Sequence, residues 1–287
     1  MRKFELLTFA LIALLAASAL LLAACGDDDD DDDAGSGGTL TFLANGEEFI
    51  RGGFTDKTSW TLSFDHFYIT LSGLTGVQVV EETDTQQLTV AHAGHPHVDI
   101  PEGAAHVALD GVYTLDLTQG DGPTTIGSMD APIGNYNYAA FNMTQQDDGD
   151  FAGYSIIMQG TATKDAETIA FTIKLTEQMT FSGCHQEVDD EFAGVVELGG
   201  EGSVETTYHS DHLFGDFGEL GNPDSVNPSA LGFQPFADLA VDGVLDIDQA
   251  QMEAQMTPDD YATFLAALYT LGHSGEGHCN YTAFDEE

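Results

Sequence analysis

Hydrophobic and polar residues alternate along much of this chain with a period of two, the pattern that predicts β-strands. The clearest example runs from residue 60 to residue 69 and is rich in aromatic and β-branched side chains. The alternation places Trp60, Leu62, Phe64, His66 and Tyr68 on one face of a strand. On that face we expect His66 to be a hydrogen-bonded core histidine rather than a metal ligand.

Other segments repeat this pattern and are bounded by turn residues. Leu40 and Phe42 precede Asn45-Gly46, a dipeptide typical of tight turns. Lys164-Asp165-Ala166 predicts the turn of one hairpin, and residues 199–202 predict the turn of another. The further strands that we expect are 76–80, 87–91, 105–117, 135–143, 154–162, 168–175, 195–198 and 204–208.

The last third of the chain predicts helices. Thr257-Pro258-Asp259-Asp260 supplies an N-cap, a proline at the first helical position and acids at the positive end of the helix dipole. Apolar residues follow at one-face spacing, and Gly272 is the expected end, while Asp248 caps a shorter helix through Gln255. Many short strands and one or two C-terminal helices predict a mainly β fold. We expect an antiparallel β-sandwich or barrel, in a single domain over residues 39–287.

The beginning of the chain follows a different pattern. Arg2 and Lys3 precede an apolar run, which ends in Leu22-Ala23-Ala24-Cys25. This order resembles the signal peptide and lipobox of bacterial lipoproteins, and such a segment is excluded from the fold. The resemblance implies that residues 1–24 are removed and that acylated Cys25 becomes the membrane anchor in the lipid bilayer. The alternative is an uncleaved transmembrane anchor, because about 17–25 apolar residues can cross a bilayer.

Residues 25–38 are interpreted as the lipidated cysteine and a disordered tether. Seven aspartates, Asp27 to Asp33, repel one another, and a Gly/Ser-rich spacer follows. Calcium binding or surface export is the alternative role for the aspartates. Since Gly26 follows Cys25, resemblance to enterobacterial lipoproteins implies the outer membrane, on its periplasmic or its surface-exposed side.

Acidity extends beyond this tether. The chain has 49 acidic and 6 basic residues; residues 1–24 hold one acid and two bases, so 48 and 4 remain beyond them. Without the seven aspartates the domain still has 41 acids against 4 bases. Nucleic acid is excluded as a partner, because binding it needs cationic side chains. Cations are favoured as ligands or as a screening atmosphere, and adaptation to saline surroundings is the alternative.

The three cysteines divide according to the lipoprotein resemblance. If Cys25 carries lipid, Cys184 and Cys279 remain as a pair in an oxidising compartment, which predicts one disulfide. A thiolate metal ligand is the alternative. The disulfide would bring the neighbouring His185 and His278 together, and Gly275 and Gly277 would let the chain fold His273 back beside them.

Histidine clustering is the main chemical lead. Imidazole with carboxylate favours a transition metal, zinc or copper, and calcium stays open as an alternative. For the loop histidines and the strand-end histidines, the alternative is a solvent-exposed side chain that binds no metal. Asp216 is a candidate additional ligand near His212. The candidate ligands are His185, His273 and His278; His209 and His212; and His92, His95 and His97.

No familiar catalytic motif appears in the sequence. Asp147-Asp148-Gly149-Asp150 lacks the spacing of an EF-hand and predicts a turn. We therefore expect a non-enzymatic, membrane-anchored envelope lipoprotein that binds a metal. The alternatives are a surface adhesion or carbohydrate-binding module, with a glycan platform of Tyr136, Tyr138 and Tyr154, or an accessory subunit whose acidic face docks a basic protein partner.

Overall fold

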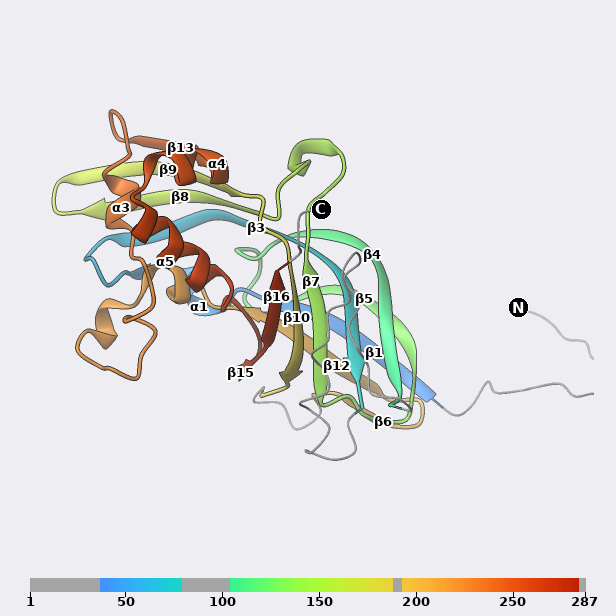
Figure 1. Cartoon of the computed structure of the whole chain (residues 1–287). Coiled ribbons are helices and arrows are strands. Elements are labelled where there is room, and N and C mark those ends of the chain that lie inside the picture. The colour runs from blue at the N-terminus through green and yellow to red at the C-terminus, as the bar shows by residue number, and fades with distance from the viewer. Residues whose placement is uncertain (1–36, 79–103, 188–192, 284–287) are drawn as a thin grey trace, which may run out of the picture. The chain divides into compact units, whose positions relative to one another are not determined.

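The computed structural model describes residues 37–78, 104–187 and 193–283, which all belong to one compact unit, Ala34–Glu287. Within these residues the fold is mainly β, and its sheets are open rather than closed into a barrel (Figure 1). The arrangement is a sandwich-like set of sheets with helices added, which confirms the predicted class. Its two parallel strand pairs, however, depart from a purely antiparallel sandwich.

The larger sheet has nine strands, in the order β13-β9-β8-β3-β7-β10-β16, with β2 and β4 also pairing with β3. The predicted hairpin around Asp165-Ala166 is confirmed, since Lys164 pairs with Glu167. The strands are β2 (Phe54–Thr55), β3 (Thr61–Val77), β4 (His106–Asp116), β7 (Tyr138–Met143), β8 (Ile156–Lys164), β9 (Glu167–Leu175), β10 (Met179–His185), β13 (Val244–Asp248) and β16 (Asn280–Ala283).

A five-stranded sheet has the order β15-β14-β12-β1-β5, and β11 and β6 form a small separate pair. In the first of these sheets β1 and β12 run parallel, whereas β5, β14 and β15 pair in the antiparallel direction. The strands are β1 (Gly37–Asn45), β5 (Thr124–Pro132), β12 (Glu201–Tyr208), β14 (Gly272–Ser274) and β15 (Gly277–His278), with β6 (Gly134–Asn135) and β11 (Val195–Val196) in the small pair.

The core between β1–β12 and the larger sheet comes from alternating side chains. Leu40, Phe42 and Ala44 of β1 are buried. The rings of Phe141 and Tyr208 meet edge to face, with centroids 5.9 Å apart, an arrangement that stabilises aromatic pairs. This packing lets one face of each strand exclude water, which explains why the period-two pattern is so clear in the sequence.

Strand β3 departs from simple alternation at Asp65. Its pairing with β8 shifts register between Phe64 and His66, which is a β-bulge, and a bulge moves the following residues to the opposite face. Phe67 is therefore buried, whereas the side chain of His66 keeps 42% of its exposure and its Nδ1 lies 2.7 Å from Asp116 Oδ2. The prediction of a core histidine is wrong, although His66 is hydrogen-bonded.

Helices α3 (Gln234–Ala237) and α4 (Gln249–Gln255) lie beside β8, β9 and β13 (Figure 1), whereas α1 (Glu47–Gly52) packs against β3. Both C-terminal helices are confirmed: Thr257 Oγ1 accepts from Asp260 N–H at 3.1 Å, and Asp248 forms a capping box with Gln251. The second helix ends at Leu268, before the predicted Gly272. The helices are α1 (Glu47–Gly52), α2 (Asp211–Phe214), α3 (Gln234–Ala237), α4 (Gln249–Gln255) and α5 (Pro258–Leu268), and the 3₁₀ turns are η2 (Gly149–Phe151) and η3 (Phe217–Glu219).

Two predicted turns have a different role. Asn45-Gly46 leads from β1 into α1, rather than into an adjacent antiparallel strand. The predicted hairpin of residues 195–198 with 204–208 is wrong, because β11 pairs with β6 and β12 pairs with β1 and β14. In both places, pairing between strands that are distant in sequence decides which strands are neighbours. The turn residues do not specify that neighbour.

Cys184 and Cys279 form the predicted disulfide, with a sequence separation of 95. Among the described residues, no helix is long and apolar enough to cross a membrane. The predicted signal peptide, Cys25, the tether up to residue 36 and the expected strand 87–91 lie outside the described residues.

Candidate metal centre

The parallel pairing of β1 with β12 brings together two segments that are far apart in sequence. Asn45 is the register partner of Thr207. Glu47 and His209 follow two residues later on their respective segments. Glu47 has a positive φ of 51°, and its backbone N–H donates to Asn45 Oδ1 at 2.9 Å. The chain turns here into α1, so the Glu47 carboxylate stays at the end of β12.

A tight hairpin supplies the third segment. His273 pairs with His278 and Ser274 with Gly277, so Gly275 and Glu276 form a two-residue turn. Gly275 has a φ of 59°, which favours glycine in such turns. Its N–H donates to Thr207 Oγ1 at 2.9 Å, which fastens the turn to β12. Glu276 is thereby held close to His209.

Within the described residues, Glu47, His209 and Glu276 each offer a ligand atom, and these atoms all lie within 4.8 Å of one another. His209 Nε2 lies 3.2 Å from the carbonyl oxygen of Gly275. A carbonyl only accepts, so Nε2 keeps its proton and Nδ1 is the nitrogen that can bind a metal. Nδ1 lies 3.5 Å from Glu47 Oε2. This is the arrangement that orients metal-ligating histidines, and the group could hold a metal ion.

The electrostatics of the group are strongly negative. Burial raises the pKa of Glu47, and the neighbouring Glu276, Glu205 and Asp211 raise it further, while His209 acts against them. Burial also raises the pKa of Asp211, again against His209. Its Oδ1 and the hydroxyl of Ser210 are buried without a hydrogen-bond partner among the described residues. Such unpaired polar atoms are costly to bury.

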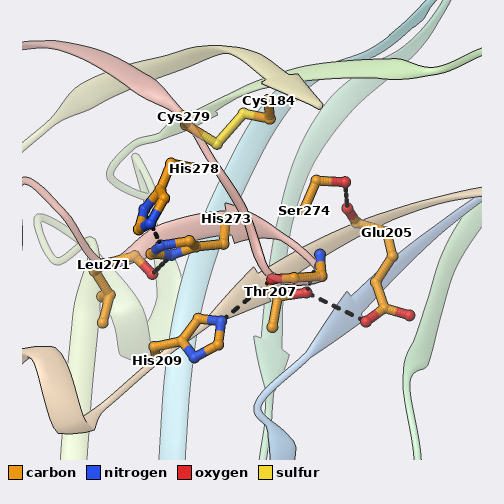
Figure 2. Close-up of a disulfide and its surroundings, with 10 residues drawn as sticks. Cys184, Glu205, Thr207, His209, Leu271, His273, Ser274, His278 and Cys279 are labelled. Atoms are coloured by element: carbon orange, nitrogen blue, oxygen red, sulfur yellow. Dashed lines mark hydrogen bonds between the residues drawn. A yellow bond between two sulfur atoms is a disulfide. The ribbon is translucent and has the colours of Figure 1, made fainter. Parts of the chain in front are cut away.

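The predicted histidine groups converge on this same corner. The ring centroid of His273 lies 4.5 Å from that of His209, 4.8 Å from that of His212 and 4.8 Å from that of His278. His273 Nε2 lies 2.9 Å from His278 Nδ1 (Figure 2). Two groups that the sequence placed separately, the strand-end pair and the pair before Cys279, therefore form one cluster.

His185 lies outside that cluster. Its ring packs against Tyr138 with centroids 5.1 Å apart, and its Nδ1 lies 3.7 Å from Glu187 Oε1. Cys184 is buried and His185 is exposed, because consecutive residues of a strand point to opposite faces. The expectation that the disulfide would unite His185 and His278 in one ligand set is therefore not met.

Other candidates are placed as follows. His92, His95 and His97 lie outside the described residues. Asp216 caps η3, where its Oδ1 accepts from Gly218 N–H at 2.8 Å. Tyr136 and Tyr138 keep only 0% and 8% of their exposure and Tyr154 is partly buried, so Tyr136 and Tyr138 do not form the exposed platform expected for a glycan.

Sequence reasoning missed both carboxylates of the group. Glu276 had a usable signal, since it lies between two glycines inside the His273–His278 hairpin. Glu47 had none, because only the pairing of β1 with β12 brings it to His209.

Comparison with known proteins found no match for this chain, whether among protein-family models, curated proteins or solved structures.

Proposed function

We propose that this chain is a lipid-anchored protein of the bacterial cell envelope that binds a transition-metal ion through Glu47, His209 and Glu276. One observation carries the proposal. The Gly275 carbonyl holds His209 through Nε2, Nδ1 faces the Glu47 carboxylate, and a ligand atom of Glu276 lies within 4.8 Å of those of both residues. A histidine oriented in this way is ready to bind a metal without rearrangement.

The donor set favours zinc. One imidazole nitrogen and two carboxylate oxygens are ligands that Zn²⁺ accepts at about 2.0–2.2 Å. Calcium prefers six to eight oxygen ligands, so the imidazole argues against it here. Three protein ligands would leave room for water in the coordination sphere.

The charge around the group supports a cation as the ligand. Glu205 and Asp211 lie close enough to raise the pKa of Glu47, as Glu276 does. Asn45 lies between two charged side chains: its Nδ2 donates to Glu205 Oε1, and its Oδ1 accepts from Arg51. The Arg51 contact is therefore to a neutral amide. A divalent ion would neutralise charge that these contacts leave uncompensated.

The envelope location is supported by two features. The segment ending at Cys25 resembles a lipoprotein lipobox, and the Cys184–Cys279 disulfide fits an oxidising compartment. Metabolic labelling with a palmitate analogue tests the anchor. Native protein should take up the label and sediment with outer membranes, whereas Cys25→Ser should lose both properties. Equal labelling of the variant would contradict the lipid anchor.

Zinc binding is tested on the full chain purified in detergent. Elemental analysis after dialysis and calorimetric titration with Zn²⁺ should show one equivalent that Glu47→Gln/Glu276→Gln loses. Glu48→Gln is the matched control, because Glu48 is exposed and adjacent to Glu47. Equal zinc uptake by the double variant and the control would refute this site, even if zinc binds elsewhere.

A further inference from the structure

His273 and His278 face each other across the β14–β15 hairpin. Their imidazoles meet through Nε2 of His273 and Nδ1 of His278, 2.9 Å apart, next to the Cys184–Cys279 disulfide (Figure 2). His273 is buried, with 3% exposure, and His278 is exposed. One nitrogen of the pair is therefore fixed in the interior, and the other is on a side chain that solvent can reach.

The hydrogen bonds define which nitrogen of His273 is free to bind. Its Nδ1 lies 3.3 Å from the Leu271 carbonyl oxygen, which only accepts, so Nδ1 carries the proton. Nε2 then holds the lone pair, and His278 Nδ1 donates to it. This is again the tautomer control found in metal-ligating histidines, whose second nitrogen donates to a carbonyl.

His212 is held in the same way. The Thr270 hydroxyl donates to the Ala267 carbonyl oxygen at 2.8 Å, so it can only accept from His212 Nδ1 at 2.9 Å. The lone pair of His212 is therefore on Nε2. The fixed tautomers of His212 and His273 leave one unprotonated nitrogen on each ring, and the ring centroids are 4.8 Å apart.

We propose that His273 and His278, with His212 beside them, form a second metal site that binds Cu²⁺ through imidazole nitrogen alone. The ion enters between Nε2 of His273 and Nδ1 of His278, and the His278 proton moves from Nδ1 to its Nε2. No electron is transferred. Copper is favoured because imidazole suits it and because Cu²⁺ binds most tightly in the first-row divalent series. The site rests on its own contacts and does not depend on the Glu47–His209–Glu276 proposal.

The test is Cu²⁺ titration of the full chain, followed by calorimetry and electron paramagnetic resonance. His278→Asn is the main variant, because His278 is exposed and its replacement should leave the fold intact. His185→Asn is the matched control: His185 is also exposed and also adjacent to a cysteine of the disulfide, yet lies outside the cluster. Copper bound elsewhere on the chain contributes to both variants, so it does not change the difference in copper binding between them.

Native protein and His185→Asn should show a copper signal with nitrogen hyperfine structure that His278→Asn loses, together with an affinity loss of about tenfold or more. Unchanged stoichiometry, affinity and hyperfine structure in His278→Asn would overturn the proposal. Circular dichroism and the melting temperature verify that this variant folds.

Two further variants distinguish loss of the imidazole ligand from loss of its hydrogen bond, and the copper site from the zinc site. His278→Gln keeps an N–H donor toward His273 but has no imidazole lone pair, so restored copper binding in it would also overturn the proposal. Glu47→Gln/Glu276→Gln should keep this copper signal while it loses zinc. Failure of one site is therefore distinguishable from failure of the other.

Discussion

Asn45 and Thr207 are register partners in the parallel pairing of β1 with β12, and this pairing builds the metal-binding corner. Asn45 Nδ2 donates to Glu205 Oε1 at 2.8 Å, and Thr207 Oγ1 accepts from Gly275 N–H at 2.9 Å. The first contact holds the β1 side of the corner, and the second holds the hairpin that carries Glu276. Residues separated by more than half of the chain thus depend on one strand pair.

Replacing Glu47 by Gln should stabilise the metal-free protein while it removes zinc binding. Burial and neighbouring carboxylates raise the pKa of Glu47, so its charged form is unfavourable in the folded state at pH 7.5. We expect a melting temperature higher by up to about 2–4 °C, the shift that about 1 kcal/mol produces in a domain of this size. Differential scanning fluorimetry in chelator measures the change.

Zinc provides the complementary measurement. It should raise the melting temperature of the native chain and of Glu48→Gln, but not that of Glu47→Gln. A metal-free Glu47→Gln protein less stable than the native chain would show that the carboxylate contributes favourably to the apo fold, against this prediction.

The metal-free protein should lose stability as pH falls from 6.5 toward 4. Burial first, and neighbouring histidines second, lower the pKa of His212 to about 4 and of His273 to about 3. Between those values and the ordinary 6.5 the unfolded chain binds more protons than the folded one, so the free energy of unfolding decreases. The loss is at most about 1.4 kcal/mol per pH unit for each histidine.

Urea denaturation at pH 7, 6 and 5 measures this dependence. His273→Gln should show a shallower slope than the native chain, and His106→Asn, at an exposed histidine, should match the native slope. The comparison between variants is needed because the raised pKa values of Glu47 and Asp211 act in the opposite direction. Identical slopes in all three proteins would contradict the prediction.

Removing the Cys184–Cys279 disulfide should strongly destabilise the domain. The disulfide joins residues separated by 95 positions. Chain-entropy models predict a stabilisation of about 4–5 kcal/mol for a loop of that length. Chemical denaturation of Cys184→Ala/Cys279→Ala should show a loss of this order, with Cys25→Ser as a control that keeps native stability. A loss below about 1 kcal/mol would contradict the entropic argument.

Stability should increase with ionic strength. Beyond residues 1–33 the chain has 41 acidic residues against 4 basic ones, and Lys174–Asp246 is the lysine–carboxylate ion pair within the described ranges. Salt shortens the Debye length from about 10 Å at 0.1 M to about 3 Å at 1 M, which screens this repulsion. The melting temperature should therefore rise by several degrees in NaCl and equally in choline chloride. A rise with NaCl alone would indicate specific cation binding instead.

Local patterns predicted a large part of the fold. The β8–β9 hairpin and the caps of α4 and α5 depend on neighbouring residues, so their turn and capping chemistry is visible in the sequence. The predicted alternation in β3 fails after Asp65, because a bulge inserts one residue without a local signal. The false hairpin between residues 195–198 and 204–208 has a similar cause, since turn residues do not name the partner strand.

The candidate sites show the same contrast between features set by neighbouring residues and features set by long-range pairing. The sequence by itself determined that histidines are clustered in an acidic chain and that Cys184 and Cys279 can pair. Only the tertiary structure decided that Glu47 joins His209, that His212 joins His273, and that His185 points away. The physical reason is that side-chain chemistry and local periodicity follow directly from the order of neighbouring residues. Which strands lie side by side depends instead on the packing of whole sheets, a property of many distant residues acting together.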